Sequence, residues 1–269
     1  MPDWSDEAII LSARPFGEAN AIVQVLTRRH GRHAGLVRGG ASRRLRPVLQ
    51  TGNRVQADWR ARLADQLGQM NVELEQASAA GVLDSRERLA GLSAACAVAE
   101  AALPEREPHP AVYDGLVALI DSLVGLPADP EPLWLAVLVQ WELGVLRELG
   151  FALVLDRCAL TGVTDDLAWV SPRSGRAVSQ DAAAPWSGRL LPLPPFLCGG
   201  PVDRTGLADG LALTGYFLER HVFAAGHRPL PAGRAGLAAV LGLDTGEPER
   251  SDAPDSMPEP AAASGETGP

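Results

Sequence analysis

The hydrophobic and polar positions in the first 80 residues form short runs that are typical of β-strands. Runs of aliphatic and β-branched residues are separated by turns that contain glycine or proline. In the last run, Met70, Val72 and Leu74 alternate with polar residues, which indicates a strand with one buried face. The pattern predicts strands at 8–14, 21–27, 33–37, 54–59 and 68–76. Five short strands favour a small antiparallel β-barrel that closes its own edges, and an SH3-like barrel fits the strand count nearly as well.

After residue 80 the apolar positions change to the spacing of helices that bury one face. The segment from Asp84 to Pro104 predicts a first helix, and Asp84 with Glu87 resembles a capping box at its start. A second helix is expected after Pro110. The third, from about 129 to Gly150, is apolar over most of its circumference and is therefore expected at the centre of a bundle.

The remaining helices lie beyond a segment without a clear period. Residues of about 156–205 are rich in glycine, proline and serine and predict an irregular insert. Thr205 is the expected cap of a fourth helix, and a short last helix follows Pro231. From 244 to 269 the chain is acidic and proline-rich, so we expect a disordered tail. The pattern predicts an α+β multidomain protein, with a barrel at 1–80 and a helical domain at 81–243.

Charge is strongly segregated along the chain. The 269 residues include 24 basic residues, all of them arginine, and 33 acidic ones, which gives a formal net charge of −9. Ten of the arginines fall between residues 28 and 62, where Asp58 is the only acid. Such a local concentration attracts a polyanion whatever the overall charge. The alternative interpretation is a set of solvated turns without a partner.

The sequence lacks the patterns that many enzymes need. It has no glycine-rich phosphate loop, no dinucleotide-binding fingerprint and no nucleophile elbow. No pair of carboxylates stands out, and no nucleophile–base pair supports a small hydrolase. We therefore expect a protein that is not an enzyme, with no catalytic residues and no cofactor.

The cysteine and histidine positions do not favour a metal site. Cys158 could begin a Cys-x-x-Cys knuckle, but Thr161 holds the second position, so a buried structural thiol and no metal are expected. His30 and His33 could form a metal pair or add to an anion site. Three widely spaced cysteines, an acidic N-terminus and the lack of a long uncharged apolar run favour a cytoplasmic protein without a signal peptide or membrane helix.

Two aromatic residues near the basic segment could stack on nucleobases. Trp59 lies on a predicted strand between Asp58 and Arg60, and a position in the barrel core is the favoured interpretation. Phe16 lies on a turn and is the better candidate for stacking.

Several segments in a fixed order carry a resemblance to a known family. They are residues 9–18, 38–46, 49–52, 146–151, 157–162 (Arg-Cys-Ala-Leu-Thr-Gly), 170–178 (Val-Ser-Pro-Arg-Ser-Gly-Arg-Ala-Val) and 228–232. Their order and spacing, over about residues 8–240, resemble the bacterial DNA repair family RecO, and its alphaproteobacterial members in particular.

The resemblance implies an N-terminal OB-fold and a helical C-terminal domain. It implies a recombination mediator that is not an enzyme: one that binds single- and double-stranded DNA and anneals complementary strands. It also implies that the protein works with RecR and the single-strand-binding protein to load RecA, in the cytoplasm at the nucleoid. Many relatives carry a four-cysteine zinc site in the insert, of which this chain keeps only Cys158.

The arginines are the candidate DNA-binding residues. The principal site is predicted in the flexible basic loop between the third and fourth strands, because an OB-fold commonly exposes its binding face there. The candidates are Arg38, Arg43, Arg44 and Arg46, then Arg28, Arg29, Arg32 and Arg54, with Phe16 for base stacking. The alternative is a protein-interaction adaptor whose arginine-rich barrel binds an acidic peptide, such as the C-terminal tail of the single-strand-binding protein.

Overall fold

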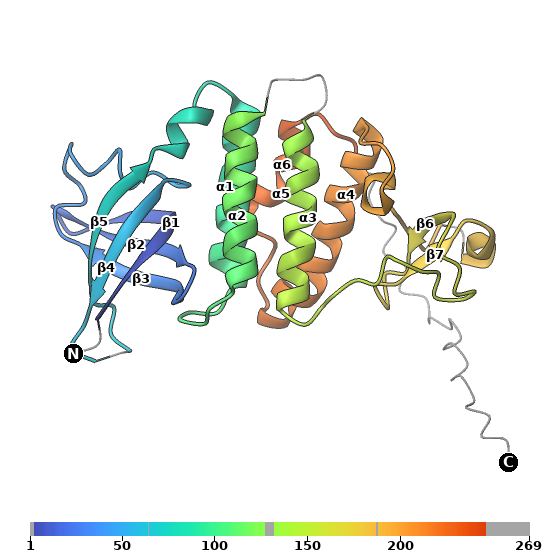
Figure 1. The fold of residues 1–269 in the computed structure, drawn as a ribbon, viewed down its shortest axis with the longest axis horizontal. Coiled ribbons are helices and arrows are strands. Elements are labelled where there is room, and N and C mark those ends of the chain that lie inside the picture. The colour runs from blue at the N-terminus through green and yellow to red at the C-terminus, as the bar shows by residue number, and fades with distance from the viewer. Residues whose placement is uncertain (1–2, 64, 127–131, 187, 246–269) are drawn as a thin grey trace, which may run out of the picture.

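The chain forms a β-barrel at one end, a group of helices in the middle and a small sheet at the other end (Figure 1). The computed structural model describes residues 3–63, 65–126, 132–186 and 188–245. Residues 246–269, which make up most of the tail that the sequence predicts, lie outside the described residues. None of the described helices is long and apolar enough to cross a membrane.

The N-terminal barrel has five strands. They are β1 (Asp3–Phe16), β2 (Asn20–Thr27), β3 (Gly31–Val37), β4 (Arg54–Arg60) and β5 (Gln69–Gln76). The sheet closes in the order β1-β2-β3-β5-β4, and all neighbouring strands are antiparallel except β3 and β5. This arrangement confirms the predicted OB-fold, and the SH3-like alternative is not the one that the chain adopts.

Alternating burial closes the barrel around its own core. Every second residue of β3 is buried, and Val23, Val55 and Met70 from the other strands are fully enclosed. A β-carbon at Gly35 of β3 would lie 2.6 Å from the β-carbon of Met70. Glycine is required there because the two side-chain positions approach too closely for a second side chain.

One side of the barrel packs on the helices. Ile9, Leu11 and Leu26 belong to the buried cluster of the helical core, and not to the cluster inside the barrel. They face α1 (Arg86–Ala102), which contacts β1 and β2. The two regions therefore share apolar surface. The predicted boundary between the two domains, at residues 80 and 81, falls inside a short 3₁₀ helix, Ser78–Val82. The division of the chain into domains at this boundary stays a proposal.

Four long helices form the bundle. After α1 come α2 (Pro110–Gly125), α3 (Leu133–Glu148), α4 (Arg204–Phe217), α5 (Ala232–Ala235) and α6 (Leu237–Val240). The short helices α5 and α6 pack against α1, and α3 lies between α2 and α4 (Figure 1). Trp134, Leu138 and Val145 of α3 are buried, which agrees with the central position that the sequence predicts for this helix.

Two helices begin at residues other than the predicted ones. Ser85 caps α1 by accepting a hydrogen bond from the Arg88 N–H at 3.3 Å, so Asp84 is not the cap. Asp203 caps α4 by accepting a hydrogen bond from a backbone N–H three residues later at 2.7 Å, so Thr205 is not the cap. Each segment contains more than one short polar residue that can cap, and the packing of the buried helix face selects between them.

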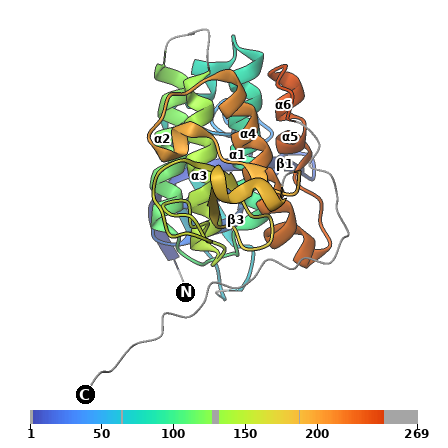
Figure 2. The ribbon, with the colours of Figure 1, turned by 90° about the vertical axis from the view of Figure 1, so that its right-hand side faces the viewer.

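The segment predicted as an irregular insert contains a small sheet. Its strands are β6 (Leu167–Val170), β7 (Ala177–Ser179) and β8 (Leu191–Pro192), paired in the order β7-β6-β8. Figure 2 shows the insert in front of the helices, at the end away from the barrel. Strands of two to four residues are too short to show a period, and for this reason the sequence does not predict them.

A buried ion pair joins α3 to the C-terminal helices. Arg234 on α5 donates through Nε and Nη2 to the two carboxylate oxygens of Glu142 on α3, at 2.6 and 2.9 Å. The Thr214 hydroxyl on α4 donates to the same carboxylate at 2.5 Å. The side chains of Arg234 and Glu142 are 4% and 0% exposed, so each charge needs the other to offset the cost of its burial.

Four aromatic rings pack together at one end of the barrel. Trp4 stacks on His30 at 4.7 Å between ring centres, and His33 meets Trp59 edge to face at 4.5 Å. His30 also contacts the carboxylate of Asp6 at 3.2 Å. His33 is 4% exposed, and its ring nitrogens have no hydrogen-bond partner within the described part of the chain. Both histidines are therefore part of the packing of the barrel.

We expect acid to destabilise the protein between pH 6.5 and pH 4. Burial, assisted by Arg106, lowers the pKa of His33 to about 4. Between these two pH values the unfolded chain binds a proton at this histidine and the folded chain does not. The free energy of unfolding therefore decreases by up to about 3 kcal/mol as the pH is lowered from 6.5 to 4. His33→Leu should remove most of this slope in urea unfolding measured at several pH values. An unchanged slope in the variant would place the acid sensitivity in another group.

Candidate nucleic-acid interface

The basic loop, defined as residues 38–53 between β3 and β4, is folded on itself. The Arg46 N–H donates to the Ser42 carbonyl at 3.1 Å, and the Leu49 N–H donates to the Leu45 carbonyl at 3.0 Å. Leu49 is buried in the barrel core, and the Asn53 amide donates to the carbonyls of residues 47 and 48. The loop that the sequence predicts as flexible is therefore a structured turn, held by an apolar anchor and by its own hydrogen bonds.

The principal candidate arginines are exposed on this loop. Arg38, Arg43, Arg44 and Arg46 are all exposed, and their side chains make no hydrogen bond or ion pair with any residue that the structure describes. A guanidinium group presents several N–H donors in a rigid plane that matches the geometry of phosphate. Free guanidinium groups on a fixed backbone are therefore well arranged for phosphate binding.

The aromatic candidate lies beside the basic loop. Phe16 ends β1 and is 51% exposed. The turn that follows it is joined to the basic loop by two hydrogen bonds. One runs from the Ala41 N–H to the Ala19 carbonyl at 3.1 Å, and the other from the Gly39 N–H to the Asn20 side-chain oxygen at 3.2 Å. An exposed ring and the exposed arginines thus share one end of the barrel.

Two arginines of the second group contact α2. Arg28 donates to both carboxylate oxygens of Asp114, at 2.8 and 3.0 Å. Arg54 pairs with Asp121 on the same helix at 3.2 Å. Both pairs connect the barrel to the helical domain, and the carboxylates reduce the positive charge that a nucleic acid would meet there.

The other two arginines of the second group also have protein partners. Arg29 donates to Asp6 at 2.9 Å. The side chain of Arg32 is 15% exposed. It donates to the Leu103 carbonyl at 2.8 Å and pairs with Glu105 at 3.2 Å, and both partners lie in the connection between α1 and α2. Arg28, Arg32 and Arg54 therefore help to hold the barrel against the helical domain, whereas Arg29 acts within the barrel. DNA binding by the eight candidate arginines stays a prediction.

One exposed arginine beside Phe16 is missing from the set derived from the sequence, because Arg14 lies on β1 two residues before Phe16. Arg62, also exposed, lies in the connection from β4 to β5. The far end of this connection meets β3 through a hydrogen bond from the Leu36 N–H to the Gly68 carbonyl at 3.0 Å. That pairing of β3 with β5 is one that no local pattern reveals.

Trp59 is a core residue, as the sequence favours. It is 2% exposed, and its indole N–H donates to the Leu67 carbonyl at 2.9 Å. A base can reach this ring only if the barrel opens, so Phe16 remains the candidate for stacking.

The residues of the insert do not fit a zinc site. Cys158 is buried, and its sulfur accepts hydrogen bonds from the Ser179 N–H at 3.3 Å and the Ser179 hydroxyl at 3.4 Å. Burial raises the pKa of this thiol, but the hydrogen bonds from Ser179 and Thr161 outweigh burial and lower the pKa to about 6. Among the described residues, no three His, Cys, Asp or Glu side chains form a group that could hold a metal.

The fold and the interface together define a class of protein. A closed five-stranded barrel carries an arginine-rich loop beside an exposed aromatic residue, and a helical bundle with a small-sheet insert follows it. The chain is thus an OB-fold protein with an appended helical domain.

Comparison with known proteins identifies the family. Residues 1–78 match the family described as Recombination protein O N terminal, and residues 83–230 match Recombination protein O C terminal. The chain is 55% identical over 235 residues to the DNA repair protein RecO of Rhodospirillum centenum, which covers 86% of this chain and 92% of that protein. It is 52% identical over 237 residues to the DNA repair protein RecO of Rhodospirillum rubrum, and these residues are 87% of this chain and 94% of that protein.

The chain therefore belongs to the RecO family of DNA repair proteins, as the order of its sequence segments predicts. A third relative, the DNA repair protein RecO of Phenylobacterium zucineum, is 51% identical over 237 residues, which are 87% of this chain and 96% of that protein. The resemblance to alphaproteobacterial members is confirmed by these relatives. Family membership supports a role in DNA repair and recombination.

The purified protein is expected to contain less than about one-tenth of an equivalent of zinc per chain, because one thiolate cannot supply a four-ligand site. Elemental analysis of protein purified without chelators measures this directly. A content near one zinc per chain would contradict the prediction.

Arg32→Ala is expected to lower the free energy of unfolding by about 1–3 kcal/mol, because it leaves the buried Leu103 carbonyl unpaired. The salt dependence of single-stranded DNA binding should not change in the folded variant. Urea unfolding and binding at several salt concentrations measure the two effects. A variant with parental stability and a flatter salt dependence would instead place Arg32 in the DNA site.

Proposed function

We propose that this protein is a recombination mediator that acts without catalysis. It binds single- and double-stranded DNA, anneals complementary strands and helps to load RecA onto DNA coated with single-strand-binding protein. The observation that carries the proposal is the set of four exposed, unpaired arginines on the folded basic loop beside Phe16. Membership of the RecO family is an independent support.

The basic loop holds the phosphate backbone in this proposal. Phosphates are alike in every sequence, so binding through arginine is largely independent of sequence. Phe16 stacks on a base of a single strand, a contact that every base can make. Neither contact occupies the base-pairing edges, so the bound strand can still pair with its complement. Annealing then needs only that a second strand is attracted to the same positive surface.

The charge of the remaining chain directs DNA to the barrel. Residues 81–269 contain thirteen arginines and twenty-five acidic residues. Arg28 and Arg54 are paired with acids of α2, so the unpaired positive charge is concentrated on the side of the barrel that carries the basic loop. A polyanion is therefore attracted to the basic loop and repelled by much of the rest of the molecule.

The proposed protein partners are RecR and the single-strand-binding protein, and the proposed location is the cytoplasm, at the nucleoid. The acidic C-terminal tail of the single-strand-binding protein is also a polyanion, and it meets the same arginines in the alternative proposal of an adaptor. Binding of a bare oligonucleotide separates the two, because an adaptor for acidic peptides does not require it. Residues 1–80 are proposed as the DNA-binding domain.

Changing Arg43, Arg44 and Arg46 together to Ala is expected to weaken single-stranded DNA binding and to suppress annealing. Each phosphate neutralised on a single strand contributes about −0.7 to the slope of log K against log salt, so the slope should flatten by about two units. Fluorescence anisotropy with a labelled oligonucleotide at several salt concentrations measures the slope. Annealing is measured with complementary oligonucleotides in the presence of single-strand-binding protein. Circular dichroism should show an unchanged fold.

The control changes Arg86, Arg147 and Arg157 to Ala, which removes the same formal charge from exposed positions outside the barrel. Unlike the loop arginines, Arg157 is paired, with Asp156 at 2.9 Å. This control should keep the parental salt slope. If both variants lose binding equally, total charge and not the basic loop governs binding. If the folded loop variant binds and anneals like the parent, the site lies elsewhere on the molecule.

A further inference from the structure

The small sheet of the insert has two apolar sides. The side turned to the bundle contributes Val170, Ala177 and Leu191 to the main helical core. The other side has a separate buried cluster, which consists of Cys158, Val178, Ala183 and Leu190. Trp169 and Trp186 pack against this second cluster. The insert therefore buries apolar side chains that are not needed to attach it to the helices.

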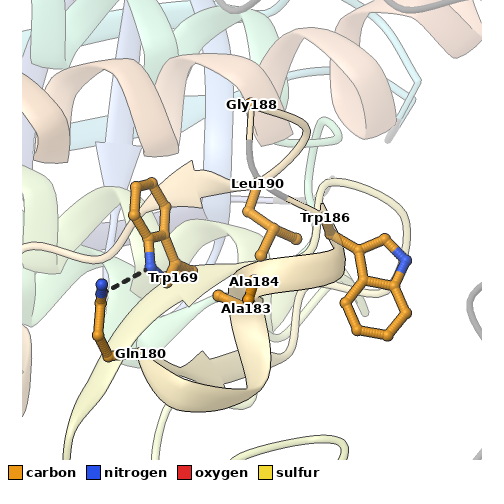
Figure 3. Close-up of a pocket in the computed structure, with 7 residues that line it drawn as sticks. All are labelled: Trp169, Gln180, Ala183, Ala184, Trp186, Gly188 and Leu190. Carbon is orange, nitrogen blue, oxygen red and sulfur yellow. Dashed lines mark hydrogen bonds between the residues drawn. The ribbon is translucent and has the colours of Figure 1, made fainter.

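A pocket of about 130 Å³ opens over the second cluster (Figure 3). Its lining includes Trp169, Gln180, Ala183, Ala184, Trp186 and Leu190. Figure 3 shows the two indoles on either side of the alanines and the leucine. An apolar cavity of about 150 Å³ holds one benzene molecule. The pocket is therefore the right size for a single six-membered ring.

The two tryptophans of the pocket are more exposed than those of the helices. Trp134 and Trp141 are 3% and 5% exposed, whereas Trp169 and Trp186 are only partly buried. The Trp169 indole N–H donates to the Gln180 side-chain oxygen at 3.0 Å, which fixes the orientation of that ring. Rigid, partly exposed tryptophans are enriched at the centres of protein-binding surfaces, because they offer a large contact area at a small cost in side-chain entropy.

Two acidic residues and one arginine lie next to residues that line the pocket. Asp181 follows Gln180 in the chain, and the Asp166 carbonyl accepts a hydrogen bond from the Gln180 N–H at 2.9 Å, so both aspartates lie beside the pocket wall. Both are exposed, and neither makes an ion pair with a described residue. Arg189, next to Leu190, is the opposing charge. This excess of acid attracts a cationic segment and repels phosphate.

We propose that the pocket docks a protein partner through one aromatic side chain flanked by Arg or Lys. The ring enters between the two indoles, and the flanking cations meet Asp166 and Asp181. The pocket lies at the opposite end of the molecule from the barrel (Figure 1), so the partner and a DNA strand on the basic loop do not compete for space. The proposal does not depend on DNA binding, because none of the residues it uses belongs to the basic loop.

The test is fluorine NMR on the full chain labelled with 5-fluorotryptophan. Trp169→Phe and Trp186→Phe each remove one signal and thereby assign it. The probe is the peptide acetyl-Gly-Arg-Phe-Arg-Gly-amide, which is expected to shift the signals of Trp169 and Trp186 and to leave the other tryptophan signals in place. Peptides with Ala in place of Phe, or with Glu in place of both Arg, are expected to bind at least about fivefold more weakly.

Two variants test the parts of the pocket separately. Ala184→Leu fills it and should abolish the shifts without changing DNA binding. Asp166→Asn combined with Asp181→Asn should remove the preference for the arginine peptide over the glutamate peptide. Asparagine suits position 166, where φ is +54°. If Ala184→Leu lowers the melting temperature, its loss of the shifts could come from disrupted folding. The proposal is then tested by the double asparagine variant alone.

Three results would overturn the proposal. The first is the absence of any shift at Trp169 and Trp186 with millimolar arginine peptide. The second is equal binding of the glutamate peptide, which would show that the acidic rim selects nothing. The third is a shift of these two signals by oligothymidine at a lower concentration than by the peptide, which would make the pocket a base-binding site.

Discussion

The apolar contact between the barrel and the first helix is the constraint on which the rest of the structure depends. Ile9, Leu11 and Leu26 are buried among helical residues, so the helical domain covers this part of the barrel surface. With the barrel docked in this way, Arg28 and Arg54 lie within reach of carboxylates on α2. The basic loop lies elsewhere on the barrel, with its arginines unpaired. The docking of the barrel thus divides its arginines into those that stabilise the joint and those that are free to bind.

Local pattern explains most of the regular elements. The barrel strands were predictable because short runs of aliphatic and β-branched residues are bounded by turn residues, and in β3 buried and partly buried positions alternate strictly. The long helices were predictable because their apolar residues repeat over several turns. Helix starts were less predictable, since Asp84 and Ser85 are both good caps and only packing distinguishes them. The sheet of the insert could not be predicted, because strands such as Leu191–Pro192 contain no repeat at all.

The candidate site was predictable as a region but not residue by residue. Arginine-rich composition marks the segment from 28 to 62, yet every arginine in it looks alike in the sequence. The partner of Arg32 is a carbonyl 71 residues away, and the partner of Arg28 is a carboxylate 86 residues away. Such contacts depend on tertiary structure alone. The same is true of the proximity of Phe16 to the basic loop, which follows from hydrogen bonds between two turns.

The ion pair between Glu142 and Arg234 sets an order of events during synthesis. The last barrel strand ends at Gln76, so the barrel can close while most of the chain has not yet been made. Glu142 has no partner until Arg234, 92 residues later, has been synthesised. Synthesis of that segment takes on the order of 5 to 20 s at ordinary rates of translation. For that interval the bundle cannot exclude water from this part of α3, because the carboxylate of Glu142 still needs solvent as a partner.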